Sequence, residues 1–141
     1  MQVNQVMTNK VTWVAPDAAL PDIARKMRDE DFGAIPVAED DRLIGMVTDR
    51  DIVVRCVAQD ADVRNTTARE VMSPRVLYCF EDESVESVLQ NMGTNQVRRL
   101  PVINRDKRLV GVVSLGDLSK AAQDPAGDAL KEISEPDDGG P

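Results

Sequence analysis

The sequence predicts an α+β fold in which two copies of one strand–helix–strand–strand–helix unit dock on each other. The first observation behind this prediction is an internal repeat, because Ala34-Ile35-Pro36-Val37 is matched further along by Arg99-Leu100-Pro101-Val102. The second is that helix-like and strand-like segments follow in the same order around both motifs. A unit of roughly fifty residues cannot cover both faces of its own sheet, so the two copies are expected to share a core.

The spacing between the copies is almost constant. Pro36 and Pro101 are 65 residues apart, whereas Gly45 and Gly111 are 66 apart. The second copy therefore carries one extra residue between these points. A loop between two strands is where such an insertion is tolerated.

Each copy is predicted to begin with a short strand and a helix. Residues 11–14 form a β-branched and aromatic run, and Pro16-Asp17 then reads as a stop followed by a helix N-cap. Apolar residues next recur at the i, i+3, i+4 and i+7 spacing of one helix face. They are Leu20, Ile23, Ala24 and Met27 in the first copy, and Val85, Val88, Leu89 and Met92 in the second.

Two short strands and a second helix complete each copy. The strands are expected at residues 34–38 and 43–47, and again at 100–103 and 109–113, with polar linkers of hairpin length between them. The second helices are expected at residues 50–58 and 115–122.

The chain is accordingly divided into repeat 1 (1–60), a polar connector (61–68), repeat 2 (69–123) and an acidic tail (124–141). The tail is expected to be mostly disordered, with one short helix near residues 129–133.

Charge and hydropathy exclude several classes of partner. The net charge is -8, and the tail supplies -5 of it. An acidic chain is repelled by nucleic acid and by anionic membrane surfaces, so neither is expected as a partner. The sequence shows neither a stretch of transmembrane length nor the pattern of a signal peptide, which makes a cytoplasmic location the default.

The two cysteines, Cys56 and Cys79, are predicted to be buried thiols in a reducing compartment. They have apolar neighbours and form no CxxC motif, and the chain has no histidine to complete a metal site. A redox pair acting as a thiol-based stress sensor is the weaker alternative.

A hydroxyl residue stands three places before an aspartate at both predicted strand-to-helix junctions. Thr48 and Asp51 form the first pair, and Ser114 and Asp117 form the second. This spacing is typical of a capping box, in which each side chain binds the backbone N–H of the other residue. The same junction suits a ligand, because a fixed carboxylate can accept hydrogen bonds from both ribose hydroxyls while free amides face a phosphate. The two roles are compatible.

The ordered motifs resemble those of paired CBS domains, the Bateman module, and more closely the stand-alone signal-transduction CBS proteins of bacterial type. The resemblance covers the chain from Val6 to Leu118. It rests on two sets of motifs in register: Val6-Met7-Thr8, Ile35-Pro36-Val37 and Leu43-x-Gly45-x-Val47-Thr48-x-x-Asp51, then Val71-Met72-Ser73-Pro74, Leu100-Pro101-Val102 and Leu109-x-Gly111-x-Val113-Ser114-x-x-Asp117.

The resemblance implies two adenosine-binding sites. Asp51 and Asp117 would hold ribose, and Thr48 and Ser114 would lie near the phosphate, with Gly116 beside them. The base would lie between backbone segments of the opposite copy. The expected segments are Thr12 and Phe32-Gly33-Ala34 beside Asp117, and Leu77 and Val97-Arg98 beside Asp51.

The resemblance also implies a homodimer, a disc of four repeats whose interface includes the second helices. The apolar residues Ile52, Val53, Val54 and Val57 are consistent with burial in such an interface.

A pair of arginines makes the two expected sites unequal. Arg98-Arg99 precedes Leu100-Pro101 where the first copy has Gly33-Ala34. Guanidinium groups suit bidentate contact with phosphate, so AMP, ADP or ATP is favoured over NAD and S-adenosylmethionine. A solvated or ion-paired arginine at a sheet edge is the alternative interpretation.

The aromatic residues Trp13 and Tyr78 lie on equivalent strands. Either could stack on a base or on a dimer partner, although a lone strand aromatic is most often part of the core.

Catalysis is not expected, because the sequence has no histidine, no phosphate-cradling glycine-rich loop and no further cluster of acids. The function predicted is a regulatory module that senses adenine nucleotides and acts on a protein target that the sequence does not identify. A scaffold for dimerisation or docking with empty sites is the alternative.

Overall fold

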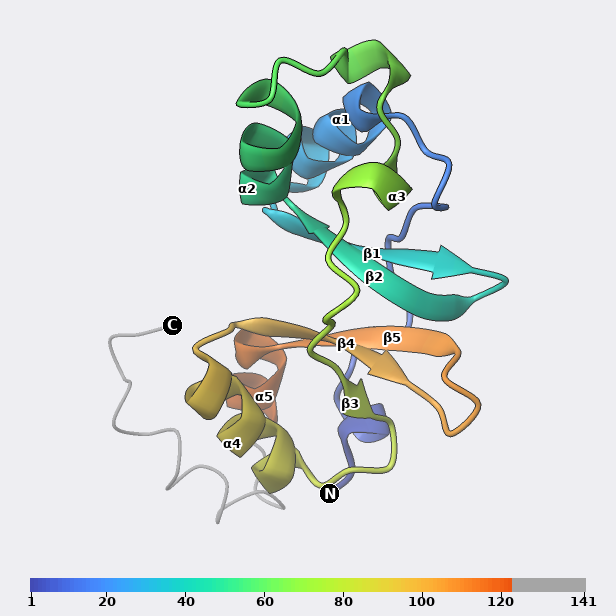
Figure 1. Ribbon diagram of the computed structural model, residues 1–141. Helices are drawn as coiled ribbons and strands as arrows, with labels where there is room; N and C mark the ends of the chain where they lie inside the picture. Colours follow the sequence, from blue (N-terminus) through green and yellow to red (C-terminus); the bar gives the residue numbers. More distant parts are fainter. Residues whose placement is uncertain (123–141) are drawn as a thin grey trace. The chain divides into compact units, whose positions relative to one another are not determined.

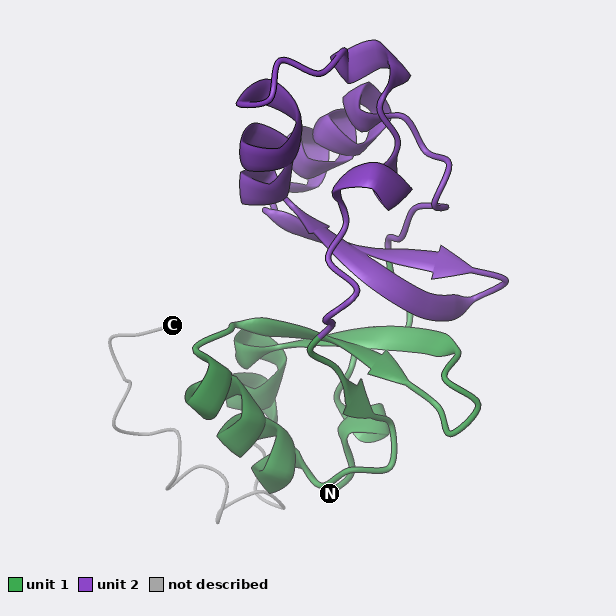
Figure 2. Ribbon diagram, in the orientation of Figure 1, with its two compact units in different colours: residues 1–11, 77–141 green, residues 12–76 purple. Residues whose placement is uncertain are grey.

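The computed structural model describes residues 1–122, which divide into two compact units (Figures 1 and 2). Unit 2 is the continuous segment Thr12–Val76, whereas unit 1 joins Met1–Val11 to the part of the chain that begins at Leu77. Both units combine helices with a β-hairpin, which confirms the α+β class. The disorder and the short helix expected at residues 124–141 lie outside the described residues.

Unit 2 is built around one hairpin, formed by β1 (Ala34–Glu39) and β2 (Arg42–Thr48), which pair antiparallel. Helix α1 (Leu20–Glu30) precedes the hairpin, and α2 (Asp49–Ile52) and α3 (Ala68–Val71) follow it. The predicted helix face of Leu20 and Ile23 is fully buried in the core of this unit. The other buried core residues are Val14, Ile35, Val37, Val47, Cys56, Ala68 and Val71.

Unit 1 repeats this plan. Strands β4 (Arg99–Ile103) and β5 (Leu109–Ser114) pair antiparallel, and β3 (Cys79–Phe80) pairs parallel with β4. Helices α4 (Val85–Asn95) and α5 (Leu115–Ala122) pack beside the sheet. The buried core residues are Val3, Cys79, Val85, Val88, Met92, Leu100, Val102, Val113, Leu118 and Ala121.

The units exchange the segments that begin the two repeats. Thr8 and Val112 form a pair of backbone hydrogen bonds of 2.8 and 3.0 Å, which attach the start of repeat 1 to β5. Ser73 and Met46 form the equivalent pair, at 2.9 and 3.0 Å, which attaches the start of repeat 2 to β2. Each compact unit is therefore a mixture of two sequence repeats.

The strand expected at residues 11–14 is wrong, because only Val14 forms a bridge with β1. The Val14 N–H donates to the Pro36 carbonyl, and the Ala38 N–H donates to the Val14 carbonyl. To lengthen this parallel strand pair, the next backbone hydrogen bond after Val14 would need the N–H of Pro16, and the one before it would need the N–H of Pro36. Proline has no N–H, so the pairing stops at Val14. In unit 1 the position of Pro16 is taken by Glu81, whose N–H does bond the Ile103 carbonyl, and a strand forms there.

The N-cap expected at Asp17 is also wrong. Helix α1 has Ala19 as its N-cap, with no side-chain capping bond, and a proline lies in its first turn. In the second repeat Ser84 occupies the equivalent position and does cap α4, accepting a hydrogen bond of 3.1 Å from the Ser87 N–H.

The helix expected at residues 50–58 is not a single α-helix. After α2, residues Val53–Val57 form a π-helical turn that ends with a hydrogen bond of 2.8 Å from the Ala58 N–H to the Val53 carbonyl. Three of its five residues are valine, whose branched side chains disfavour a regular α-helix. The turn buries Cys56 and leaves Val53, Val54 and Val57 exposed.

Within residues 1–122, none of the helices is long and apolar enough to span a bilayer.

Candidate functional site

Both predicted hydroxyl–aspartate pairs form complete capping boxes. The Thr48 N–H donates to Oδ2 of Asp51 at 2.8 Å, and the Asp51 N–H donates to the Thr48 hydroxyl at 3.0 Å. In unit 1 the Ser114 N–H donates to Oδ2 of Asp117 at 2.9 Å, and the Asp117 N–H donates to the Ser114 hydroxyl at 3.0 Å. These bonds fix each carboxylate at the start of α2 or α5.

The geometry leaves part of each carboxylate available to a ligand. Only Oδ2 takes part in each capping box, and within residues 1–122 Oδ1 of Asp51 and Oδ1 of Asp117 form no hydrogen bond. An ionised carboxylate has about four acceptor sites on its two oxygens. One oxygen can therefore accept the capping hydrogen bond while the other remains able to accept hydrogen bonds from a ligand. The structure therefore shows the capping role and leaves room for the ribose role.

In unit 2 the segment Phe32-Gly33-Ala34 lies beside the first hydroxyl–aspartate pair. Ala34 faces Thr48 across the hairpin, and the Asp49 N–H donates to the Gly33 carbonyl at 2.9 Å. A side chain at Gly33 would meet the Asp49 carboxylate, since an added Cβ would lie 2.8 Å from its Oδ2. The contact expected between this segment and Asp117 would join the two units, and it stays a prediction.

In unit 1 the equivalent segment, Val97-Arg98-Arg99, lies beside the second pair. Arg99 faces Ser114 across the hairpin, and the Leu115 N–H donates to the Arg98 carbonyl at 2.8 Å. Gly116 lies exposed in the first turn of α5, where an added Cβ would meet only the Ser114 hydroxyl, at 3.6 Å. The contact expected between this segment and Asp51 likewise stays a prediction.

The remaining candidates, Thr12 and Leu77, lie toward the same ends of their sheets. Val14 and Cys79 run parallel to β1 and β4, so Thr12 and Leu77, two residues earlier, lie toward the starts of those strands. The Thr12 hydroxyl donates to the Glu30 carboxylate at 2.7 Å, whereas Leu77 is exposed. The thirteen candidate residues therefore form two groups, one within each unit.

The charge around the two groups differs more than the arginines alone predict. Asp49, which no motif of the sequence singles out, adjoins Gly33 in unit 2, and the equivalent position in unit 1 is the uncharged Leu115. Arg98 and Arg99 are both exposed in unit 1. The unit 1 junction therefore carries more positive charge around its carboxylate than the unit 2 junction does.

The cysteines lie apart from both groups and are buried, as predicted. Cys56 and Cys79 are free thiols with 0% and 1% exposure. Burial, with a smaller contribution from the charge of Glu83, raises the pKa of Cys79 to about 12. A thiol that stays protonated is a poor nucleophile and a poor metal ligand. Within residues 1–122, no group of three His, Cys, Asp or Glu side chains could hold a metal ion.

The repeat has a counterpart among known proteins, because the model of the CBS domain family matches residues 3–57 and 68–124. The chain belongs to the CBS domain family. The CBS domain-containing protein YhcV of Bacillus subtilis is 40% identical over 134 residues, which cover 94% of each chain. A crystal structure of Hypoxic Response Protein I, which holds two coordinated zinc ions, is 38% identical with a TM-score of 0.74, covering 85% of this chain and 98% of that one.

Two further CBS structures share the fold and contain adenosine compounds. CBSX2 in complex with AMP is 22% identical, with a TM-score of 0.73 over 86% of this chain and 95% of that one. The CBS domain pair of protein MJ0100, in complex with 5′-methylthioadenosine and S-adenosyl-L-methionine, is 23% identical, with a TM-score of 0.69 over 85% and 98%. At these identities the likeness extends to the fold alone.

Proposed function

We propose that the chain is an adenine-nucleotide-binding regulatory module, that it binds AMP, ADP or ATP, and that it acts in signal transduction rather than in catalysis. The observation that carries the proposal is the pair of capped carboxylates. Asp51 and Asp117 are each held rigidly through one oxygen and keep the other for the vicinal hydroxyls of a ribose. A preorganised acceptor avoids the entropic cost of ordering a mobile side chain on binding.

The preference for a phosphorylated ligand rests on unit 1. Arg98 and Arg99 are exposed next to the start of α5, where the amides of the first turn and the Ser114 hydroxyl also lie. Charge-assisted bonds from guanidinium groups to phosphate are among the stronger hydrogen bonds in proteins. The AMP in CBSX2 supports a nucleotide, and the compounds in MJ0100 support the adenosine part alone. Unit 1 is therefore the proposed high-affinity site.

A homodimer is part of this proposal. Val53 is 56% exposed and Val57 is 60% exposed on the π-helical turn of unit 2. Exposed valines on successive turns of one surface element are costly to hydrate, and a subunit interface would bury them. Sensing then requires that nucleotide bind two arrangements of the protein with different affinity.

Isothermal titration calorimetry tests the proposed ligand class. AMP, ADP, ATP, NAD and S-adenosylmethionine are titrated into the wild-type protein and into the Asp51→Asn and Asp117→Asn variants. Asparagine keeps a side-chain oxygen for the capping box and removes the negative charge. The proposal predicts tighter binding of the phosphorylated adenosines, with the larger loss in Asp117→Asn.

The Ser84→Ala variant is the matched control for stability. It removes the cap of another helix of unit 1, α4, and touches no candidate ligand residue. It should therefore bind like the wild type. Absence of binding across the whole panel would favour the ligand-free scaffold instead.

A further inference from the structure

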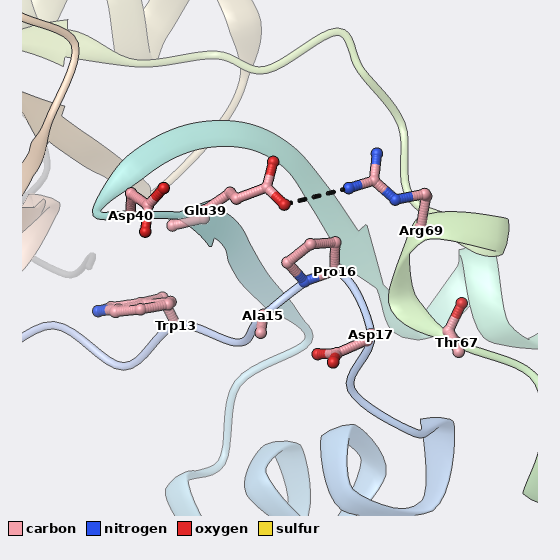
Figure 3. Close-up of a pocket in the computed structure, with 9 residues that line it drawn as sticks. Trp13, Ala15, Pro16, Asp17, Glu39, Asp40, Thr67 and Arg69 are labelled. Carbon is pink, nitrogen blue, oxygen red and sulfur yellow. Dashed lines mark ion pairs between the residues drawn. The ribbon is translucent and has the colours of Figure 1, made fainter.

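A pocket of about 460 Å³ in unit 2 lies away from the hydroxyl–aspartate pair and has no part in the proposed function (Figure 3). It lies at the hairpin end of the sheet, whereas Thr48 and Asp51 lie at the other end. Trp13 and Asp17 lie on the two sides of Ala15, and an ion pair between Glu39 and Arg69 forms another part of the wall. Every lining residue belongs to unit 2.

The residues around the pocket have equivalents in unit 1, because the backbone hydrogen bonds of the two repeats match. Val14 bridges Val37 in the same parallel sense in which Cys79 pairs with Val102. The Arg69 N–H donates to the Pro16 carbonyl just as the Asn4 N–H donates to the Glu81 carbonyl. Trp13, Ala15 and Asp17 are therefore equivalent to Tyr78, Phe80 and Asp82.

In unit 1 this position is filled by a guanidinium group from the chain itself. Nε and Nη2 of Arg105 donate to the two carboxylate oxygens of Asp82 at 3.1 and 2.8 Å. The same guanidinium lies 4.0 Å from the centre of the Phe80 ring, which in turn packs edge-on against Tyr78 at 5.5 Å. An aromatic ring and a carboxylate thus hold an arginine by stacking and bidentate hydrogen bonds.

Unit 2 keeps the acceptor, Asp17, and one aromatic ring, Trp13, which is equivalent to Tyr78 and not to the Phe80 ring that stacks on Arg105. The Asp17 side chain forms no hydrogen bond or ion pair within residues 1–122, and Trp13 is 36% exposed. Alanine replaces the Phe80 ring, which leaves the space hollow. The arginine that lines the pocket, Arg69, is paired with Glu39 at 3.6 Å.

The hairpin explains why the two units differ. In unit 2 the turn has two central residues, Asp40 and Asp41, both with positive φ. Between equivalent strand pairs, unit 2 has four residues (39–42, between Ala38 and Leu43), whereas unit 1 has five (104–108, between Ile103 and Leu109). The second of these five is Arg105, which reaches back over Phe80. The extra residue seen in the sequence therefore coincides with the presence of the internal arginine.

We propose that the unit 2 pocket binds an arginine side chain of a partner protein. Asp17 would accept its hydrogen bonds as Asp82 accepts those of Arg105, and Trp13, which lines the same pocket, would supply the aromatic ring that Ala15 does not. Indole is the best of the aromatic rings for stacking on a cation. The bidentate geometry favours arginine over lysine. This pocket is separate from the proposed nucleotide sites. Arginine binding can therefore be tested whether or not the protein binds nucleotide.

Fluorescence of Trp13, the one tryptophan in the sequence, is the direct readout. N-acetylarginine methylamide is titrated into the full-length protein at constant ionic strength, with the citrulline counterpart as an uncharged probe of the same shape. The expected result is a saturable change in Trp13 emission with the arginine probe alone. Asp17→Asn should weaken that binding about twofold to fivefold, because it removes the charged acceptor of an exposed ion pair.

Asp82→Asn is the matched control, because it removes the same charge from the equivalent position of unit 1. It should leave the Trp13 titration unchanged. Asp17 forms no bond within the described residues, so its substitution should also leave the folded structure and its melting temperature intact. An equal response to citrulline, or equal weakening by Asp17→Asn and Asp82→Asn, would overturn the proposal. A response to spermidine that exceeds the response to the arginine probe would overturn the arginine side chain as the occupant.

Discussion

Replacing Gly111 with alanine should destabilise unit 1, because its backbone packs directly against the exchanged N-terminal segment. An added Cβ would lie 2.8 Å from the Thr8 carbonyl oxygen and 2.7 Å from Sδ of Met7. The methionine sulfur can move, but Thr8 is fixed by two hydrogen bonds to Val112, of 2.8 and 3.0 Å. Relief therefore requires a backbone shift, which typically costs about 1 to 3 kcal/mol of unfolding free energy.

Urea unfolding followed by circular dichroism measures this loss, with Gly93→Ala as the control. Gly93 lies in α4, and an added Cβ there would meet no atom within 4 Å. Alanine should stabilise this position by about 0.5 kcal/mol through its better helix propensity. Adding Met7→Ala to Gly111→Ala should not restore stability, since the clash with the Thr8 carbonyl remains. Wild-type stability of Gly111→Ala would refute the packing of residues 1–11 against β5.

Three further outcomes follow from the contacts described above. Because burial raises the pKa of Cys79 from 9.0 to about 12, this thiol ionises more easily in the unfolded chain than in the folded one. The free energy of unfolding should therefore fall as the pH rises from about 9 towards 12, and a Cys79→Ala variant should show a flatter pH dependence in urea titrations. Ser84→Ala should cost about 1 kcal/mol in thermal unfolding, because the Ser87 N–H loses its 3.1 Å cap, whereas a conservative Ser84→Thr change should cost less. Val57→Glu should reduce the dimer fraction in analytical ultracentrifugation while leaving the circular dichroism spectrum of the folded chain unchanged, since Val57 is 60% exposed, and a dimer fraction equal to wild type would place the interface elsewhere.

Local patterns in the sequence predicted the elements that depend on local forces. The spacing of Leu20 and Ile23 predicted α1, and the polar linkers between apolar runs predicted both hairpins. The family resemblance rested on motifs that the CBS family model also matches. Thr48 and Asp51 were expected to form a capping box, and they do.

Pairings over long distances were harder to predict. The exchange that attaches Thr8 to Val112 depends on backbone bonds between residues about a hundred positions apart, which no local pattern encodes. The strand at residues 11–14 was overestimated, although the prolines that interrupt its ladder, Pro16 and Pro36, are visible in the sequence.

The sites show the same division between local and distant information. The hydroxyl–aspartate spacing identified a rigid carboxylate, but the pairing of Gly33 with Asp49 emerged only from the hairpin register. The unit 2 pocket was not predicted, because its meaning depends on a contact in the other unit, where Arg105 fills the equivalent position. A comparison of Asp17 with Asp82 along the repeat is the signal that could have found it.

The most direct test of ribose binding by Asp51 and Asp117 compares AMP with its 2′,3′-dideoxy analogue in titration calorimetry. The ribose hydroxyls are proposed to donate to the unbonded carboxylate oxygens of Asp51 and Asp117, and a hydrogen bond to a charged group contributes about 1.5 to 3 kcal/mol. The wild-type protein should therefore bind AMP at least about tenfold more tightly than the analogue. The Asp51→Asn/Asp117→Asn double variant should lose most of that difference. Equal affinity of the wild-type protein for both nucleotides, or the same discrimination in the double variant, would show that these carboxylates do not bind ribose.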